Sequence, residues 1–132
     1  MTNLNFIPAH QLAQMIRDSP KERLRQRQVS AVEAIEAYLA QIATHNSTLN
    51  AICTLDEVNA CVRAKQADEA LARGENWGAL HGVPVTIKDI FETAGLRTTA
   101  GYIPLKDYIP QQDATVVARL RSAGAIILGK TN

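Results

Sequence analysis

A lysine stands at the end of a short apolar stretch, where a side-chain amine could do chemistry. In the stretch 83–88, Val83, Val85 and Ile87 are two residues apart, so they share one face of an extended segment and Lys88 points to the other. If such a lysine is buried, its ammonium form is disfavoured and the neutral amine can act as a general base. The carboxylate of the next residue could instead keep it charged. The residues alone favour an ordinary lysine at a strand end.

A second lysine lies in a segment that matches the letters of a phosphate-binding loop. Residues 124–131 read Gly-Ala-Ile-Ile-Leu-Gly-Lys-Thr, which fits GxxxxGK[ST]. Such a loop needs a strand before the first glycine and a helix after the Lys-Thr pair. Here a helix is expected before Gly124, the intervening residues are aliphatic, and only Asn132 follows Thr131. We therefore predict a strand buried on both faces over 125–128, and no nucleotide cofactor.

The composition is that of one folded domain and identifies no partner. The chain has 132 residues, 46% of them hydrophobic and 20% charged, which is enough for a core of its own. A net charge of +1 gives no electrostatic argument for nucleic acid or for an anionic membrane. The basic cluster over 17–27 could bind phosphate, but interspersed acidic residues favour a solvated surface.

The termini and cysteines indicate a reducing, cytoplasmic protein. The first residues carry neither a basic region nor a long apolar region of a signal peptide, and no apolar run is long enough to cross a membrane. Cys53 and Cys61 have no zinc-type spacing, so we predict no metal site and no disulfide. Both are expected to be buried free thiols.

Helical and extended segments then alternate along the chain. Helices are expected over about 8–73, with a first helix near Pro8, a second starting at the capping box Ser30–Glu33 and running to about His45, and a third capped by Asp56 and ended by Gly74. A short buried strand over 51–55 separates the last two. Strands over 83–87 and 125–128 flank a helix capped by Asp113.

This order predicts an α/β fold with layered helices on a mixed, partly parallel sheet. If the chain ended there, the strand 125–128 would be an unprotected sheet edge, and such edges pair with other chains. We therefore expect residues 1–132 to form a single partial domain. It would self-associate or pair with a missing C-terminal portion.

Several blocks in order resemble the N-terminal region of the amidase signature family. They are 80–89 (Leu-His-Gly-Val-Pro-Val-Thr-Ile-Lys-Asp), 93–101, 113–120 and 124–132. The resemblance is strong over 80–132 and looser over 8–73, and it implies the N-terminal part of the amidase fold. It also implies hydrolysis of carboxylic amides by a Ser, cis-Ser, Lys triad with a small-molecule amide substrate. Lys88 takes the position of the triad lysine, a buried general base.

The chain departs from that family in lacking the glycine- and serine-rich signature that carries both serines. Its serines are Ser19, Ser30, Ser47 and Ser122, and none is flanked by two glycines. We therefore expect the isolated chain to be inactive. Two alternatives stay open: a non-catalytic module that associates through its exposed strand edge, and the start of the A-type subunit of a tRNA-dependent amidotransferase. We rank the second lower because no basic surface indicates tRNA binding.

Overall fold

A computed structural model describes residues 20–132, so the helix predicted from Pro8 and the start of the basic segment 17–27 lie outside the described residues. The elements in chain order are α2 (Pro20–Arg25), α3 (Ala31–Leu49), β1 (Ile52–Leu55), α4 (Glu57–Ala72), β2 (Pro84–Lys88), the 3₁₀ helix η2 (Ile103–Leu105), α5 (Thr115–Ser122) and β3 (Ile126–Thr131). The described part of the basic segment therefore includes a helix, α2.

The three strands form a mixed sheet in the order β1-β3-β2. β3 runs antiparallel to β1 and parallel to β2, which confirms the prediction of a mixed, partly parallel sheet. The prediction that 125–128 forms a free edge is wrong, because β3 is the central strand and is hydrogen-bonded on both sides. Burial on both faces fits a central strand. The edges of this sheet are β1 and β2, and β2 begins with Pro84, which has no N–H to donate.

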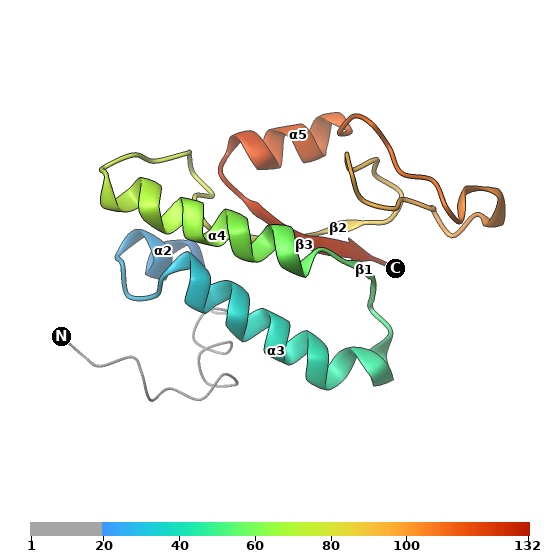
Figure 1. Cartoon of the computed structure of the whole chain (residues 1–132), viewed down its shortest axis with the longest axis horizontal. Helices are drawn as coiled ribbons and strands as arrows, with labels where there is room; N and C mark the ends of the chain where they lie inside the picture. Colours follow the sequence, from blue (N-terminus) through green and yellow to red (C-terminus); the bar gives the residue numbers. More distant parts are fainter. Residues whose placement is uncertain (1–19) are drawn as a thin grey trace.

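Helices α3 and α4 lie side by side on one face of the sheet, as Figure 1 shows. Four alanines of α4 recur at helical spacing and are fully buried, so the helix backbone comes close to its neighbours. They are Ala60, Ala64, Ala67 and Ala70. Ile35 of α3 and Ile126 and Leu128 of β3 complete this core. Gly74, with φ +81°, follows α4 as the predicted left-handed terminator.

The start of α3 is fixed by two carboxylates. The Glu33 side chain accepts a hydrogen bond from the Ser30 N–H while the Glu33 N–H donates to Ser30 Oγ, which is the predicted capping box. Asp68 of α4 adds a cap that the sequence did not suggest, because its carboxylate accepts from the N–H groups of Ala31 and Val32 at 2.8 and 3.0 Å. The helix also runs further than the predicted end at about 45, to Leu49.

Three expectations of burial and capping are wrong. β1 is half exposed because it is an edge strand, and Cys53 on it is exposed while Cys61 is half-buried. Asp56 takes the predicted N-cap position of α4, although its side chain makes no capping hydrogen bond, whereas the N-cap of α5 is Ala114 and not the predicted Asp113. Asp113 instead accepts from the N–H of Ala94 and pairs with Arg121, so it joins the loop after β2 to α5.

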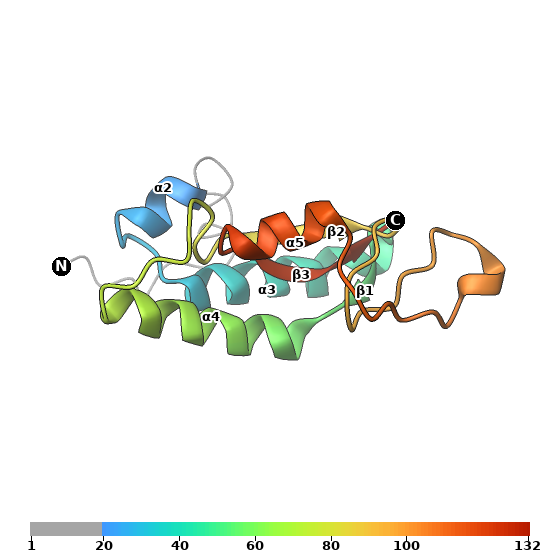
Figure 2. The ribbon, with the colours of Figure 1, turned by 90° about the horizontal axis from the view of Figure 1, so that it is seen from above.

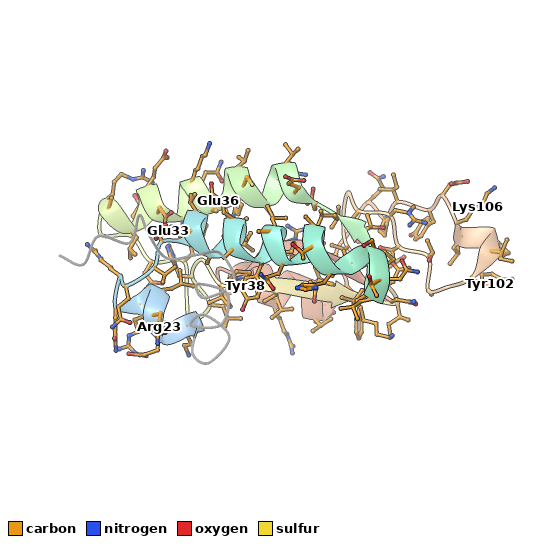
Figure 3. All side chains as sticks on the ribbon, turned by 90° about the horizontal axis from the view of Figure 1, so that it is seen from below. Arg23, Glu33, Glu36, Tyr38, Tyr102 and Lys106 are labelled. Atoms are coloured by element: carbon orange, nitrogen blue, oxygen red, sulfur yellow. The ribbon has the colours of Figure 1, made fainter. Side chains whose placement is uncertain are left out.

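The opposite face of the sheet carries α5 and a smaller core. Val117 is its buried helical residue, packed with Ile87, Leu96 and Ile127. Part of the connection between β2 and α5 projects beyond the carboxyl ends of β2 and β3 as an arm that carries η2 (Figure 2). Figure 3 labels Tyr102 and Lys106 on this arm, at the far end of the molecule from Arg23. No helix within 20–132 is long and apolar enough to cross a membrane.

Candidate functional site

Lys88 is the last residue of β2, at the edge where β2 and β3 both end. Its neighbour Ile87 is 4% exposed and points into the α5 core, so the alternation of the strand turns Lys88 to the other face. Lys88 is exposed in this chain. The expectation that it is buried is therefore wrong for the described residues, because nothing in them covers this end of β2.

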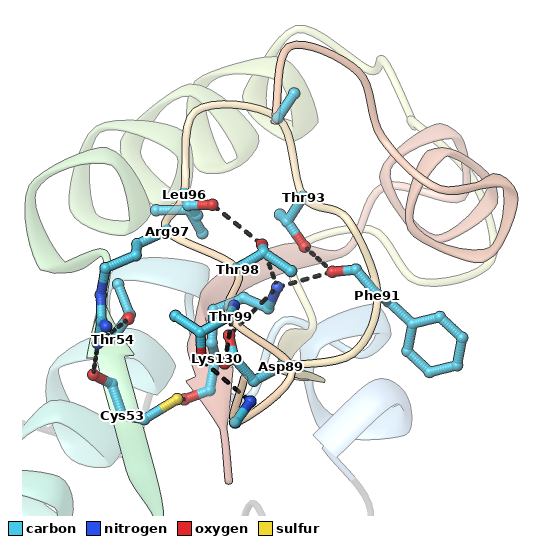
Figure 4. Close-up of polar contacts among 12 residues, drawn as sticks. Cys53, Thr54, Asp89, Phe91, Thr93, Leu96, Arg97, Thr98, Thr99 and Lys130 are labelled. Carbon is cyan, nitrogen blue, oxygen red and sulfur yellow. Dashed lines mark hydrogen bonds and ion pairs between the residues drawn. The ribbon is translucent and has the colours of Figure 1, made fainter. Parts of the chain in front are cut away.

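Asp89, the residue after Lys88, is committed to other partners. Its Oδ2 accepts from the N–H of Thr99 at 3.0 Å and from the Thr99 hydroxyl at 2.5 Å. Its Oδ1 lies 3.8 Å from the Nζ of Lys130. The possibility that Asp89 holds Lys88 charged is thus replaced by a different ion pair, shown in Figure 4.

Lys130 of β3 is the buried lysine of the site, and its side chain is 0% exposed. Its Nζ donates to the carbonyl oxygen of Phe91 and to the hydroxyl of Thr98, both at 2.7 Å (Figure 4). Burial lowers the pKa of the Lys130 ammonium, against the opposing effects of the Asp89 carboxylate and Cys53. The segment that matched a phosphate-binding loop is a strand, and its lysine is enclosed by protein.

A second turn, over 99–102, is hydrogen-bonded to the residue after Lys88 and has an unusual backbone conformation. Ala100 has φ +52°, in the left-handed region that costs a non-glycine residue about 1 kcal/mol. Its N–H donates to the Asp89 carbonyl at 3.0 Å, and the Gly101 N–H donates to the Thr99 hydroxyl at 3.2 Å. These bonds keep the turn next to the exposed lysine. Strained backbone of this kind clusters at functional sites.

The sequence did not single out Lys130 or Thr98 as members of the site. A signal was available, since a strand predicted to be buried on both faces carries a lysine at its end. A charge in such a strand must find a partner. The partner lies in a segment more than thirty residues earlier, and that pairing is decided by the fold.

The described serines do not join Lys88. Ser30 is bonded to Glu33 at the start of α3, Ser47 is exposed on α3, and Ser122 is exposed at the end of α5. Among residues 20–132, no group of three or more His, Cys, Asp or Glu side chains could hold a metal ion. The described site therefore consists of Lys88 and Lys130, together with Asp89 and the turn over 99–102 that is bonded to it.

Comparison with known proteins identifies the class. The Amidase family model matches residues 33–132. The chain is 48% identical over 111 residues to the A-type subunit of glutamyl-tRNA(Gln) amidotransferase from Geobacter sulfurreducens, and 44% identical over 109 residues to the Neorickettsia sennetsu protein of the same name. These alignments cover 84% and 83% of this chain.

Solved structures agree with the family match. An amidase family protein from Bacillus anthracis superposes with a TM-score of 0.81 at 32% identity, over 98% of this chain and 27% of that one. A peptide amidase from Stenotrophomonas maltophilia gives a TM-score of 0.78 at 34% identity, over 92% of this chain and 24% of that one.

The chain belongs to the amidase family. It spans about a quarter of the length of its relatives: 23% of both amidotransferase proteins.

Proposed function

We propose that this chain carries the base-bearing segment of an amide hydrolase with a Ser, cis-Ser, Lys triad, and that Lys88 is the base. The observation that carries the proposal is the position of Lys88, exposed at the carboxyl end of β2 within the Amidase match. Both serines would come from sequence that the chain does not contain. That sequence would also cover Lys88 and exclude water from its amine.

In this proposal the neutral amine of Lys88 removes a proton from the bridging serine. The bridging serine in turn takes the proton of the nucleophilic serine as it attacks the amide carbonyl, and an acyl-enzyme forms when the carbon–nitrogen bond breaks. The proton is returned to the leaving nitrogen, and water then hydrolyses the ester. The free, partly exposed thiols of Cys53 and Cys61 fit a reducing compartment, so we place this chemistry in the cytoplasm.

The proposal is tested by supplying the serines. In one protein, residues 1–132 replace the matching segment of the Bacillus anthracis amidase family protein, which aligns with 98% of the chain. The fusion should release ammonia or amine from simple amides, and Lys88→Met should lower kcat by about 10²- to 10⁴-fold, the usual contribution of a general base.

The isolated chain provides the complementary measurement. It should release no ammonia from aliphatic or aromatic amides, because the described serines are remote from Lys88. Amide hydrolysis by the isolated chain that Lys88→Ala abolishes would contradict the proposed division of the triad. A fusion whose activity is unchanged by Lys88→Met would contradict the role of Lys88.

A second candidate is the A-type subunit of a glutamyl-tRNA(Gln) amidotransferase. Its support is sequence similarity, because relatives with that name are 43–48% identical over 79–85% of this chain, whereas the solved amidases are 28–36% identical. In this case the amide cleaved would be that of glutamine, and the chemistry at Lys88 would be the same.

A comparison of substrates distinguishes the simple amide hydrolase from the amidotransferase subunit. The fusion would carry the relative's substrate pocket, so the comparison needs the protein encoded by the whole reading frame that contains residues 1–132. If glutamine is hydrolysed faster in the presence of a glutamylated tRNA and its partner subunits, the amidotransferase candidate is supported. If simple amides are hydrolysed and glutamine is not, the candidate is excluded.

A further inference from the structure

The buried lysine is attached to the turn that begins at the exposed one. The Nζ of Lys130 reaches Asp89, Phe91 and Thr98, at 3.8, 2.7 and 2.7 Å respectively. Two of these residues follow Lys88 directly in the chain, at one and three positions. Lys130 therefore joins the central strand to both ends of the loop that leaves β2.

A β-bulge turns Lys130 toward this loop. Val85 is paired with Ile127, but the next residue of β2 is paired with Gly129, so β3 has one extra residue at Leu128. After this bulge Lys130 is paired with Ile87 and lies on the same face of the sheet, toward α5 and the loop. Without the extra residue, the two-residue repeat of the strand would send the lysine to the opposite face.

Gly129 is required at the bulge by the close approach of β1. A Cβ atom at this position would overlap the carbonyl oxygen of Thr54. The pairing of Thr54 with Lys130 then continues the sheet on that side. Both neighbouring strands thus hold the backbone that carries the buried ammonium.

The backbone of Lys88 is fixed between the sheet and this anchor. On one side Lys88 is paired with Thr131. On the same side, the N–H of Asp89 donates to the carbonyl of Thr131 at 2.9 Å, and toward the loop the Lys88 carbonyl accepts from the N–H of Phe91 at 3.0 Å. Because Lys130 holds Phe91 and Asp89, releasing the ammonium would free the turn that sets the direction of Lys88.

Lys130 is not suited to act on a substrate itself. Its side chain has no exposed surface, and two of its N–H groups are used in short hydrogen bonds to protein oxygens. A buried charge is costly unless it is paired and hydrogen-bonded. Its oppositely charged partner, Asp89, is nearly as enclosed, at 10% side-chain exposure.

We propose that Lys130 is a positioning residue for Lys88: its enclosed ammonium pins Asp89, Phe91 and Thr98 and thereby fixes the point from which the Lys88 amine reaches the bridging serine. This inference rests on the proposed function of Lys88. It predicts a loss of turnover per intact active site, because an error of about 1 Å in the position of a catalytic group costs about 10²-fold.

The test uses the fusion of residues 1–132 with the Bacillus anthracis protein. Four single variants of this fusion are compared with the parent fusion. Lys130→Met removes the ammonium and keeps the length of the side chain. Thr98→Val removes one of its acceptors and keeps the shape, which provides a second variant if Lys130→Met does not fold. Lys106→Met removes an exposed lysine of the arm as a control, and Lys88→Met reports on the base.

Active sites are counted by the end-point of serine labelling with a fluorophosphonate, and kcat is expressed per labelled site. Lys130→Met should lower kcat per site about 10- to 100-fold, with KM changed less than about 3-fold. Thr98→Val should have a smaller effect in the same direction, and Lys106→Met none. Hydrogen exchange at the amides of Phe91 and Ala100 should accelerate more in Lys130→Met than exchange at the α3 and α4 amides does.

The outcomes distinguish failure of the inference from failure of the proposed function. If Lys88→Met is inactive while Lys130→Met and Thr98→Val lose labelled sites but keep kcat per site, Lys130 is merely structural and the inference is overturned. If the parent fusion is inactive or Lys88→Met is as active as the parent, the proposed function fails and the inference falls with it.

Discussion

Lys88 and Lys130 stand on neighbouring parallel strands, and the fold places them in opposite environments. Lys130 is paired with Ile87, the residue before Lys88. One lysine is exposed at the strand end, while the other is fully buried with three oxygen partners. The difference shows that the burial of a lysine in this sheet depends on which face of the sheet it occupies. Here a single extra residue in β3 determines that Lys130 lies on the face toward α5.

The largest expected effect is the loss of the buried charge. Lys130→Met should lower the free energy of unfolding by about 3–5 kcal/mol, because the Asp89 carboxylate then remains buried without its counter-charge. Lys88→Met should change it by less than about 0.5 kcal/mol, since that side chain is exposed. Urea unfolding of the 132-residue chain measures both. Equal losses of unfolding free energy in the two variants would show that the buried and the exposed lysine contribute equally to stability.

The bulge that separates the two lysines can be tested at Gly129. Gly129→Ala places a Cβ against the Thr54 carbonyl, so β1 or β3 must shift. We expect a loss of about 1–3 kcal/mol in unfolding free energy, the usual cost of overpacking. Gly95→Ala is the matched control, because no atom lies near its Cβ and its φ is also positive, at +77°. If Gly129→Ala lowers the free energy of unfolding no more than Gly95→Ala does, the strands can move apart at little cost at this position.

The partnership of Lys130 with Asp89 predicts a coupling between them. Asp89→Asn in the Lys130→Met background removes the orphaned charge, so the double variant should be more stable than the sum of the single losses predicts. We expect a coupling of about 1–2 kcal/mol, within the range for directly interacting residues. A double-mutant cycle by urea unfolding gives this value. Strict additivity would indicate that the 3.8 Å ion pair is energetically silent.

The smallest effect is a dependence of stability on pH. Burial lowers the pKa of Lys130 below its ordinary value of 10.5, while Asp89 and Cys53 oppose the shift. Between the folded-state pKa and 10.5 the unfolded chain binds more protons, so the free energy of unfolding rises with pH in this window and levels off above it.

The measurement is the difference in unfolding free energy between the parent and Lys130→Met, at about pH 8 and at about pH 10. The parent should gain stability relative to the variant as the pH increases. Cys53→Ser in both backgrounds removes the contribution of Cys53 to the pKa of Lys130. A relative loss by the parent would mean that the ion pair with Asp89 outweighs burial.

Much of the fold could be predicted because its signals are local. The capping box at Ser30, the terminator Gly74 and the apolar run 125–128 each identify an element through nearby residues. Sheet order could not be predicted in this way. An apolar strand at the end of the described chain was expected at the edge, but it lies in the centre because two strands from earlier in the chain pair with its two sides.

The candidate site also has a part that local sequence predicts and a part that only the fold shows. The sequence singled out Lys88 from the alternation of residues 83–88 and from family resemblance, and that resemblance predicted that the two serines of a triad lie outside residues 1–132. It placed Asp89 beside Lys88 as a possible partner. Only the folded structure shows that Asp89 pairs with Lys130, because an ion pair between distant segments leaves no pattern in the sequence of either segment.

By itself, the sequence determined the family, the periodic elements and the residue types available for chemistry, since these depend on composition and local spacing. The tertiary structure decided that β3 is central, that a bulge at Leu128 turns Lys130 inward, and that Lys88 remains exposed. The physical reason is that register and burial follow from packing against residues far away in the chain. Lys130 is thereby buried among oxygen partners, while Lys88 stays exposed at the end of β2.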